Sequence, residues 1–264
     1  MILDKLAADS EKRVEASKLR KSLAEIKKEA EQLDANTGFP FARALAAPGM
    51  SFICEVKKAS PSKGVIVGDF PYLQIAREYE SAGAAAISVL TEPEFFLGSD
   101  RYLQEIAAEV NIPVLRKDFT VDAYQIYEAR ILGASAVLLI CTLLEEHTLK
   151  EYLEIAHSLG LSALVEAHDE REIDQAVQAG AQIIGVNNRN LKNFEVDVNN
   201  SVRLRERIPE DKIYVSESGI KTPEDVGVLY CNGTDAVLIG ETLMRSTDKA
   251  GELAMLKRDC HGEN

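Results

Sequence analysis

Short apolar runs rich in β-branched side chains recur along the chain and alternate with segments of helical spacing. Near-continuous apolar runs of this length are typical of strands that are buried on both faces, as in a parallel sheet. Helical spacing is clear, for example, in residues 72–79 and 149–156. This alternation predicts βα units. The predicted strands are 52–57, 85–91, 112–116, 136–141, 162–166, 183–187, 213–217 and 236–240, which is the number that closes a (β/α)₈ barrel.

A repeated glycine junction supports this interpretation. Gly83, Gly133, Gly180 and Gly233 each precede an even-numbered run, at the point where a helix needs a left-handed residue to end. Their spacing of about fifty residues corresponds to two βα units. A doubly wound open sheet is the competing fold, but residues 60–64 lack the glycine fingerprint that usually follows its first strand. The predicted fold class is therefore α/β, a single-domain (β/α)₈ TIM barrel.

The first fifty or so residues lie outside the count of βα units. Residues 3–33 are rich in charge and predict one or two helices, which we expect to pack on the barrel. The predicted organisation is an N-terminal helical extension at 1–48, the barrel at 49–258 and a C-terminal tail at 259–264. An undivided barrel of this length is ordinary.

Composition excludes several classes of partner. A net charge of −13 argues against nucleic acid and anionic membranes, although a local pocket of N–H groups and lysines can still hold a small anion. The charged N-terminus is unlike a signal peptide, and no apolar run approaches a membrane span, so we expect a cytoplasmic protein. The sequence is compatible with a monomer but carries no signal of oligomeric state.

The cysteines and histidines show no metal-ligand spacing, so no metal site is predicted. Cys54, Cys141 and Cys231 lie in or beside apolar segments and are interpreted as reduced core thiols. His147 and His157 fall on a predicted surface helix, and His261 is near the C-terminus. His168, two residues beyond Glu166, is interpreted as a loop residue or as support for a neighbouring site residue.

Ionisable and amide groups lie at the ends of four predicted strands, where buried strands normally avoid them. Glu55 and Lys57 end the first strand and share a face by its alternation. Lys117 follows the third strand, Glu166 ends the fifth, and 187–189 (NNR) end the sixth. Because the carboxyl ends of barrel strands converge on one rim, this set predicts an acid–base site rather than structural ion pairs.

Glycines follow the last two predicted strands, at Ser218-Gly219 and Gly240-Glu241. Loops in these positions commonly bind phosphate because bare backbone N–H groups can approach it. The alternative is that each glycine merely permits a tight turn, but Lys57 and Ser60 on the adjoining first strand favour phosphate. The adjacent aromatics in 94–98 (EFFLG) offer a stacking wall for an aromatic substrate or belong to the core.

Taken together, these motifs resemble the indole-3-glycerol phosphate synthase family. The similar stretches occur in family order over about residues 50–245: 55–62 (EVKKASPS), 90–92 (LTE), 96–99 (FLGS), 115–119 (LRKDF), 164–168 (LVEAH), 185–191 (GVNNRNL) and 216–220 (SESGI). The charged N-terminal extension is also similar. The resemblance implies ring closure of 1-(2-carboxyphenylamino)-1-deoxyribulose 5-phosphate to indole-3-glycerol phosphate, with loss of CO₂ and water, in tryptophan biosynthesis.

The resemblance also implies roles for individual residues. Lys117 protonates the oxygen that becomes negative during ring closure, Glu166 is the base of dehydration, and Lys57 orients the substrate carboxylate or assists as an acid. The remaining implied roles are holding hydroxyls and lysines (Glu55, Asn187, Glu217), bracing the sixth-strand loop (Arg189), walling the anthranilate ring (Phe96, Phe119), and binding phosphate (Ser60, Ser218, Gly219, Gly240 and the backbone of Glu241). These steps imply no cofactor or metal.

Two alternatives remain open at the level of sequence. The first is another phosphate-binding barrel, such as phosphoribosylanthranilate isomerase, which normally uses a Cys/Asp acid–base pair. Cys54 is expected to point away from Glu55 and Lys57, which disfavours that reading. The second is a barrel that binds a ligand without catalysis, but such a protein would not need the converging lysines and glutamates.

Overall fold

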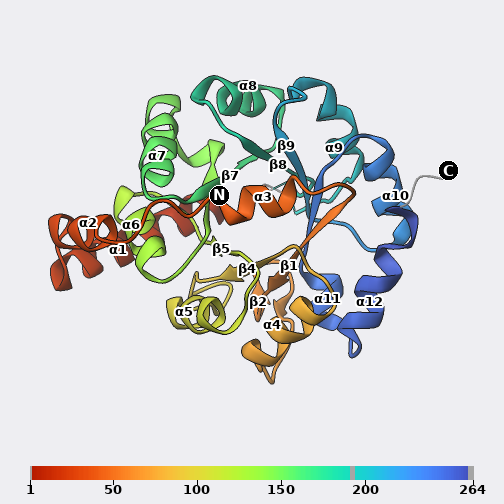
Figure 1. Cartoon of the computed structure of the whole chain (residues 1–264), viewed down its shortest axis with the longest axis horizontal. Helices are drawn as coiled ribbons and strands as arrows, with labels where there is room; N and C mark the ends of the chain where they lie inside the picture. Colours follow the sequence, from red (N-terminus) through yellow and green to blue (C-terminus); the bar gives the residue numbers. More distant parts are fainter. Residues whose placement is uncertain (1, 191–193, 261–264) are drawn as a thin grey trace.

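The predicted apolar runs form strands buried on both faces, since one face turns toward the barrel interior and the other toward a layer of helices (Figure 1). The computed structural model describes residues 2–190 and 194–260. The strands in barrel order are β1 (Ser51–Val56), β10 (Ala236–Ile239), β9 (Ile213–Glu217), β8 (Ile183–Asn187), β7 (Ser162–Ala167), β6 (Ala136–Ile140), β5 (Val114–Lys117) and β4 (Ala86–Leu90), with β4 closing on β1. All neighbouring pairs are parallel, which confirms the predicted TIM barrel.

The outer layer consists of helices that return the chain from one strand to the next. They are α4 (Tyr72–Ser81), α5 (Asp100–Glu109), α6 (Ala123–Ile131), α7 (Glu146–Ser158), α8 (Glu170–Ala179), α9 (Asn199–Leu204), α10 (Pro223–Cys231), α11 (Glu241–Arg245) and α12 (Lys249–Leu256). Short 3₁₀ turns η1 (Cys141–Leu143), η2 (Arg205–Arg207) and η3 (Arg258–Cys260) complete it. All four junction glycines predicted to be left-handed have positive φ, from 76° to 92°.

The N-terminal extension contacts both ends of the barrel. It contains α1 (Ile2–Arg20), α2 (Leu23–Glu31) and the short α3 (Pro40–Leu45), of which α3 was not predicted. Phe41 and Leu45 of α3 are fully buried against interior residues of the strands, so α3 closes the amino-terminal end (Figure 1). At the other end, residues of the first turns of α1 line a cavity. The boundaries at 48/49 and 258/259 stay a prediction, and residues 261–264 of the proposed tail lie outside the described part.

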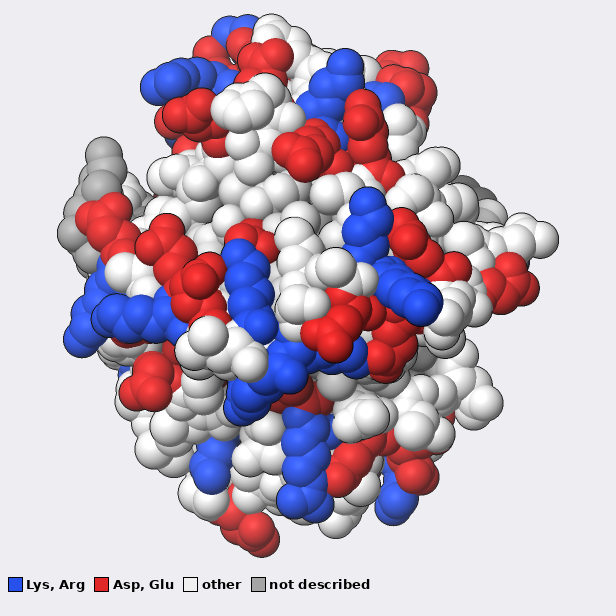
Figure 2. All heavy atoms as spheres, turned by 90° about the vertical axis from the view of Figure 1, so that its left-hand side faces the viewer, with Lys and Arg blue, Asp and Glu red and all other residues white. Residues whose placement is uncertain are grey.

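Helices α1 and α2 also form much of the face in Figure 2, where basic and acidic side chains are interleaved. Lys18 bridges Glu15 of its own helix and Asp122, the residue before α6, which ties α1 to the barrel layer. Among the described residues, no helix is both long and apolar enough to cross a bilayer.

Three local expectations need correction. The third strand was expected at 112–116, but β5 spans Val114–Lys117, so Lys117 belongs to the strand itself. The loop after β1 contains an unpredicted antiparallel hairpin of β2 (Ala59–Ser60) and β3 (Gly64–Val65). Cys54 and Cys141 are buried as expected, whereas Cys231 is exposed because it ends α10 on the solvent side.

Candidate active site

Strand alternation places a polar side chain at the last inward position of several barrel strands. Within β1, Phe52, Cys54 and Val56 pack outward on the helices, while Ile53 and Glu55 face inward. The same alternation in β5, β7, β8 and β9 gives Lys117, Glu166, Asn187 and Glu217, which follow apolar inward residues deeper in the barrel. Parallel register then sets their neighbours, since Asn187 pairs with Glu217 across β8 and β9.

A cavity of about 540 Å³ opens at this carboxyl-terminal rim, within the size range of small-molecule sites. The structure brings together in its lining every site residue predicted from the sequence: Glu55, Lys57, Ser60, Phe96, Lys117, Phe119, Glu166, Asn187, Arg189, Glu217, Ser218, Gly219, Gly240 and Glu241. The sequence reasoning missed further lining residues, among them the apolar Ile2, Leu3 and Leu6 of α1 and the basic Lys63, Lys221 and Arg245.

Three largely buried ion pairs form the floor of the cavity. The Nζ atom of Lys117 lies 3.5 Å from Oε2 of Glu166 and 3.6 Å from Oε2 of Glu217. Lys57, the residue directly after β1, pairs with Glu55 of that strand, as their shared face predicted. Asn187 Nδ2 donates a hydrogen bond of 3.0 Å to Oε1 of Glu166. An ammonium therefore lies between carboxylates of two other strands, which is an arrangement suited to moving protons.

The surroundings shift the pKa values of three of these groups. Burial alone lowers the pKa of Lys117, but the carboxylates of Glu166, Glu217 and Glu55 outweigh it, so the net pKa is raised. Burial raises the pKa of Glu55, but the ammonium groups of Lys57 and Lys117 lower it more, so the net pKa is lowered. Burial, with the nearby Glu166 and Glu55, raises the pKa of Glu217 to about 8. Lys117 thus stays an ammonium at neutral pH, while Glu217 readily holds a proton.

The glycine loops after β9 and β10 shape the opposite side of the cavity. Ser218 and Gly219 both have left-handed backbones, with φ of 71° and 84°. A side chain in place of Gly219 would be strained in this conformation and would clash with Val196. Gly240 leaves room for the pair formed by Glu55 and Lys57. The carboxylate of Glu241 pairs with Arg245 at 3.0 Å. Burial raises its pKa, but the hydrogen bond from Arg245 and the charges of Lys63 and Arg245 lower it more, so the net pKa is lowered.

We expect Gly240→Ala to lower kcat/KM by about 10²-fold, the scale of effect that misplaced catalytic groups produce. A Cβ atom at this position would overlap Glu55 Oε1 and lie 2.9 Å from Lys57 Nζ, so the pair must shift. Steady-state kinetics on the substrate that the sequence resemblance implies measure the effect. Gly68→Ala is the matched control, because no atom lies within 4 Å of its added Cβ. Unchanged kinetics in Gly240→Ala would show that the pair's position is unimportant.

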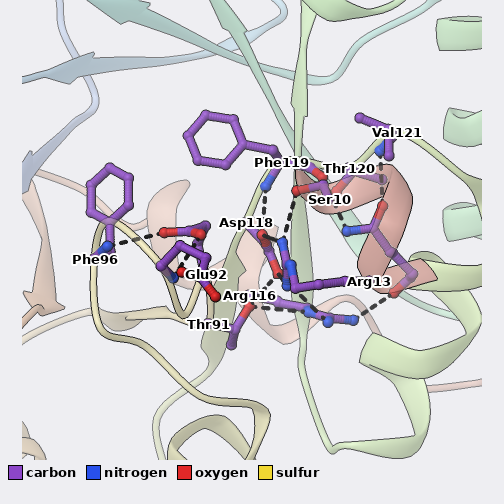
Figure 3. Close-up of polar contacts among 12 residues, drawn as sticks. Ser10, Arg13, Thr91, Glu92, Phe96, Arg116, Asp118, Phe119, Thr120 and Val121 are labelled. Atoms are coloured by element: carbon purple, nitrogen blue, oxygen red, sulfur yellow. Dashed lines mark hydrogen bonds and ion pairs between the residues drawn. The ribbon is translucent and has the colours of Figure 1, made fainter. Parts of the chain in front are cut away.

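Two buried carboxylates hold the aromatic side of the cavity. The rings of Phe96 and Phe119 lie 6.0 Å apart at 41°. The Glu92 carboxylate accepts the backbone N–H of Phe96 at 3.0 Å, together with those of the two preceding residues (Figure 3). Asp118 accepts the N–H of Phe119 at 2.8 Å. Neither carboxylate was predicted as a site residue, although each belongs to a stretch that resembles the family.

The loop after β8 is fixed by its own residues. Arg189 donates its backbone N–H to Asn187 Oδ1 at 3.0 Å, and its Nη1 donates to the carbonyl of Phe194 at 3.4 Å. Leu191, part of the sequence motif, lies outside the described residues. Across the described part of the chain, no three His, Cys, Asp or Glu side chains gather as metal ligands.

The strand ends of this (β/α)₈ barrel bring lysine–carboxylate pairs, an aromatic wall and glycine loops together in one cavity. This combination defines an acid–base enzyme of the phosphate-binding TIM-barrel class. A family model described as indole-3-glycerol phosphate synthase matches residues 3–256. The chain belongs to the indole-3-glycerol phosphate synthase family.

Individual relatives agree with the family model. The chain is 60% identical to an indole-3-glycerol phosphate synthase of Ruminiclostridium cellulolyticum, over 97% of this chain and 99% of the relative. It is also 60% identical to one of Endomicrobium trichonymphae, over 97% of this chain and 100% of the relative. A solved structure of 3-hexulose-6-phosphate synthase from Salmonella typhimurium superimposes with a TM-score of 0.66 at 15% identity, covering 80% of this chain and 98% of that one, and this likeness concerns the fold alone.

Proposed function

We propose that this chain closes 1-(2-carboxyphenylamino)-1-deoxyribulose 5-phosphate to indole-3-glycerol phosphate, releasing CO₂ and water, as a cytoplasmic step of tryptophan biosynthesis. Membership of the family and 60% identity to relatives of that name support the activity. The observation that carries the proposal is the position of the Lys117 ammonium between the carboxylates of Glu166 and Glu217, inside one cavity with Phe96 and Phe119.

Ring closure requires an acid. As the aryl carbon that bears the carboxylate attacks the ketone, negative charge develops on the ketone oxygen, and the Lys117 ammonium supplies a proton to it. The raised pKa of Lys117 keeps the group charged before the step. Loss of CO₂ then returns the bonding electrons to the ring and restores its aromaticity. Low exposure of the cavity floor strengthens each of these electrostatic contacts.

Dehydration requires a base and an acid on opposite sides of the departing hydroxyl. Glu166 removes the substrate proton that is lost in this step. Oε1 of Glu166 is held by Asn187, so Oε2 is the oxygen that accepts the proton. Lys57, paired with Glu55, orients the substrate carboxylate or assists as an acid. Glu217 and Glu55 hold the lysines and the substrate hydroxyls. None of these steps transfers electrons to an external acceptor, so the mechanism needs no redox cofactor.

The remaining site residues bind the two ends of the substrate. Phe96 and Phe119 enclose the anthranilate ring, and Arg189 braces the loop after β8. The phosphate lies against Ser60, Ser218, Gly219, Gly240 and the backbone of Glu241, with Lys63 and Arg245 supplying positive charge nearby. In this proposal residues 1–48 act as an extension whose first helix completes the cavity wall.

The experiment is to incubate the purified protein with the carboxyphenylamino substrate and follow the appearance of indole fluorescence. We expect turnover in the wild type and a loss of about 10²-fold or more in Glu166→Gln, which keeps the shape but cannot act as a base. Activity only on phosphoribosylanthranilate would contradict the proposal in favour of an isomerase. Tight binding of the substrate without turnover would favour a non-catalytic barrel.

A further inference from the structure

We infer that His168 is a positioning residue for Glu166: its imidazolium ties one carboxylate oxygen of Glu166 to the first turn of α8, so that the other oxygen faces Lys117 and the cavity. This inference rests on the proposed role of Glu166 as the base. His168 follows β7 directly, and its side chain is largely buried. It does not line the cavity, so it acts through Glu166 rather than on the substrate.

The two oxygens of Glu166 have different surroundings. Oε1 accepts the hydrogen bond from Asn187 at 3.0 Å and lies 3.4 Å from Nε2 of His168. Oε2 lies 3.5 Å from Nζ of Lys117. One oxygen is thus held from behind by an amide and an imidazole, and the second is left for proton transfer. Such a division fixes the rotation of the carboxylate about its last bond.

The charge of His168 follows from its partners. Oε2 of Glu172 accepts both the backbone N–H of His168 at 2.8 Å and the ring Nδ1 at 3.0 Å. Because a carboxylate only accepts, Nδ1 must carry a hydrogen. Nε2 is buried, makes no hydrogen bond within the described residues, and lies 3.4 Å from Oε1 of Glu166. A neutral ring would leave its lone pair beside that oxygen, whereas an imidazolium places an N–H and a positive charge there.

Every element packed around the ring favours or permits the positive charge. Burial lowers the pKa of His168, but the carboxylates of Glu172 of α8 and Glu166 of β7 outweigh it, with a smaller contribution from Glu217 of β9, so the net pKa is raised. From α9, the neutral Asn200 donates to the His168 carbonyl at 3.2 Å.

Glu172 itself is held firmly in place. Thr142 Oγ1 of η1 donates to its Oε1 at 2.5 Å, and its backbone N–H donates to the cap residue Asp169 at 2.9 Å. Glu172 lies in the first turn of α8, where a negative charge is stabilised by the helix dipole. Its own pKa is lowered, since contacts with His168 and Thr142 outweigh burial. The chain Glu172–His168–Glu166 therefore connects a rigid helix end to the proposed base.

The test combines kinetics with NMR of the imidazole nitrogens. In His168→Gln, which can donate one hydrogen bond but carries no charge, we expect kcat at neutral pH to fall about tenfold with little change in KM. In the wild type, kcat should decline as pH rises through the pKa of His168, and this decline should be absent from His168→Gln. His147→Gln, at an exposed position on α7, is the matched control and should behave as the wild type.

Glu172→Gln provides the second variant. Loss of the carboxylate at Nδ1 should lower the NMR-measured pKa of His168 by about one unit and move the decline in kcat to lower pH by the same amount. Because Glu172 touches neither Lys117 nor Glu217, such a shift assigns the decline to His168. An active wild type whose kcat and pH profile survive in His168→Gln would overturn the inference, as would NMR signals of a neutral ring at about pH 6. An inactive wild type would instead reject the proposed function, and the NMR titration would still decide the charge.

Discussion

Lys117→Ala is expected to lower kcat by about 10²–10⁴-fold, the contribution of a positioned acid, while the barrel remains folded. The variant removes the ammonium that lies 3.5 Å from Glu166 and 3.6 Å from Glu217, and no other lysine in the described part of the chain forms an ion pair with either carboxylate. The measurement is single-turnover formation of indole fluorescence, with circular dichroism and urea unfolding to verify the fold. A larger effect on kcat than on KM is expected, since the proton is transferred in the transition state.

The fold should survive because the carboxylates around Lys117 can take up protons. Burial and its neighbours already raise the pKa of Glu217 to about 8, and loss of the ammonium raises it further. Glu217 therefore stays protonated in the variant and adds no further uncompensated charge to the cavity floor. Lys150→Ala, at an exposed position on α7, is the control and should retain full turnover. Turnover close to that of the wild type in Lys117→Ala would remove this residue from the mechanism.

The barrel could be predicted because its determinants are local. Apolar runs, helical spacing between them and a glycine at each second junction depend only on residues close together in the sequence. Strand alternation likewise predicts that Glu55 and Lys57 share a face. The limits of β5 were harder to predict, because Ile112-Pro113 belongs to the apolar run although the strand begins only at Val114. The six residues of α3 carry too little periodicity to be recognised before the barrel end that they cover is known.

Contacts within the site depend on the barrel register, which the sequence does not reveal. That Lys117 contributes to the site follows from its strand end, but its position between Glu166 and Glu217 requires three strands in their observed order. The residues that support the site were not predicted, for the same reason. Asp118 contacts Arg13 of α1, which is 105 positions away in the sequence, and no local pattern indicates such a contact.

That contact belongs to a buried network beneath the aromatic wall (Figure 3). Arg13 of α1 donates through both terminal nitrogens to Asp118, at 2.8 and 3.1 Å, and Thr91 donates to the same carboxylate at 2.7 Å. Arg116 lies 3.7 Å from Asp118 and also pairs with two other carboxylates. Asp118 is therefore the point at which the N-terminal extension, β5 and the backbone of Phe119 are joined.

Asp118→Ala is expected to lower the free energy of unfolding by about 3 kcal/mol, because it leaves the partly buried Arg13 and the buried Arg116 without this carboxylate and Thr91 without its acceptor. Urea unfolding measures the change as a lower midpoint at unchanged slope. Arg13→Ala and the double variant complete a cycle, in which the two effects should be far from additive. Asp9→Ala removes only the partner of the exposed Lys12 on the same helix and should leave stability nearly unchanged. Additive effects of Asp118→Ala and Arg13→Ala would mean that the bidentate pair does not attach α1 to the barrel.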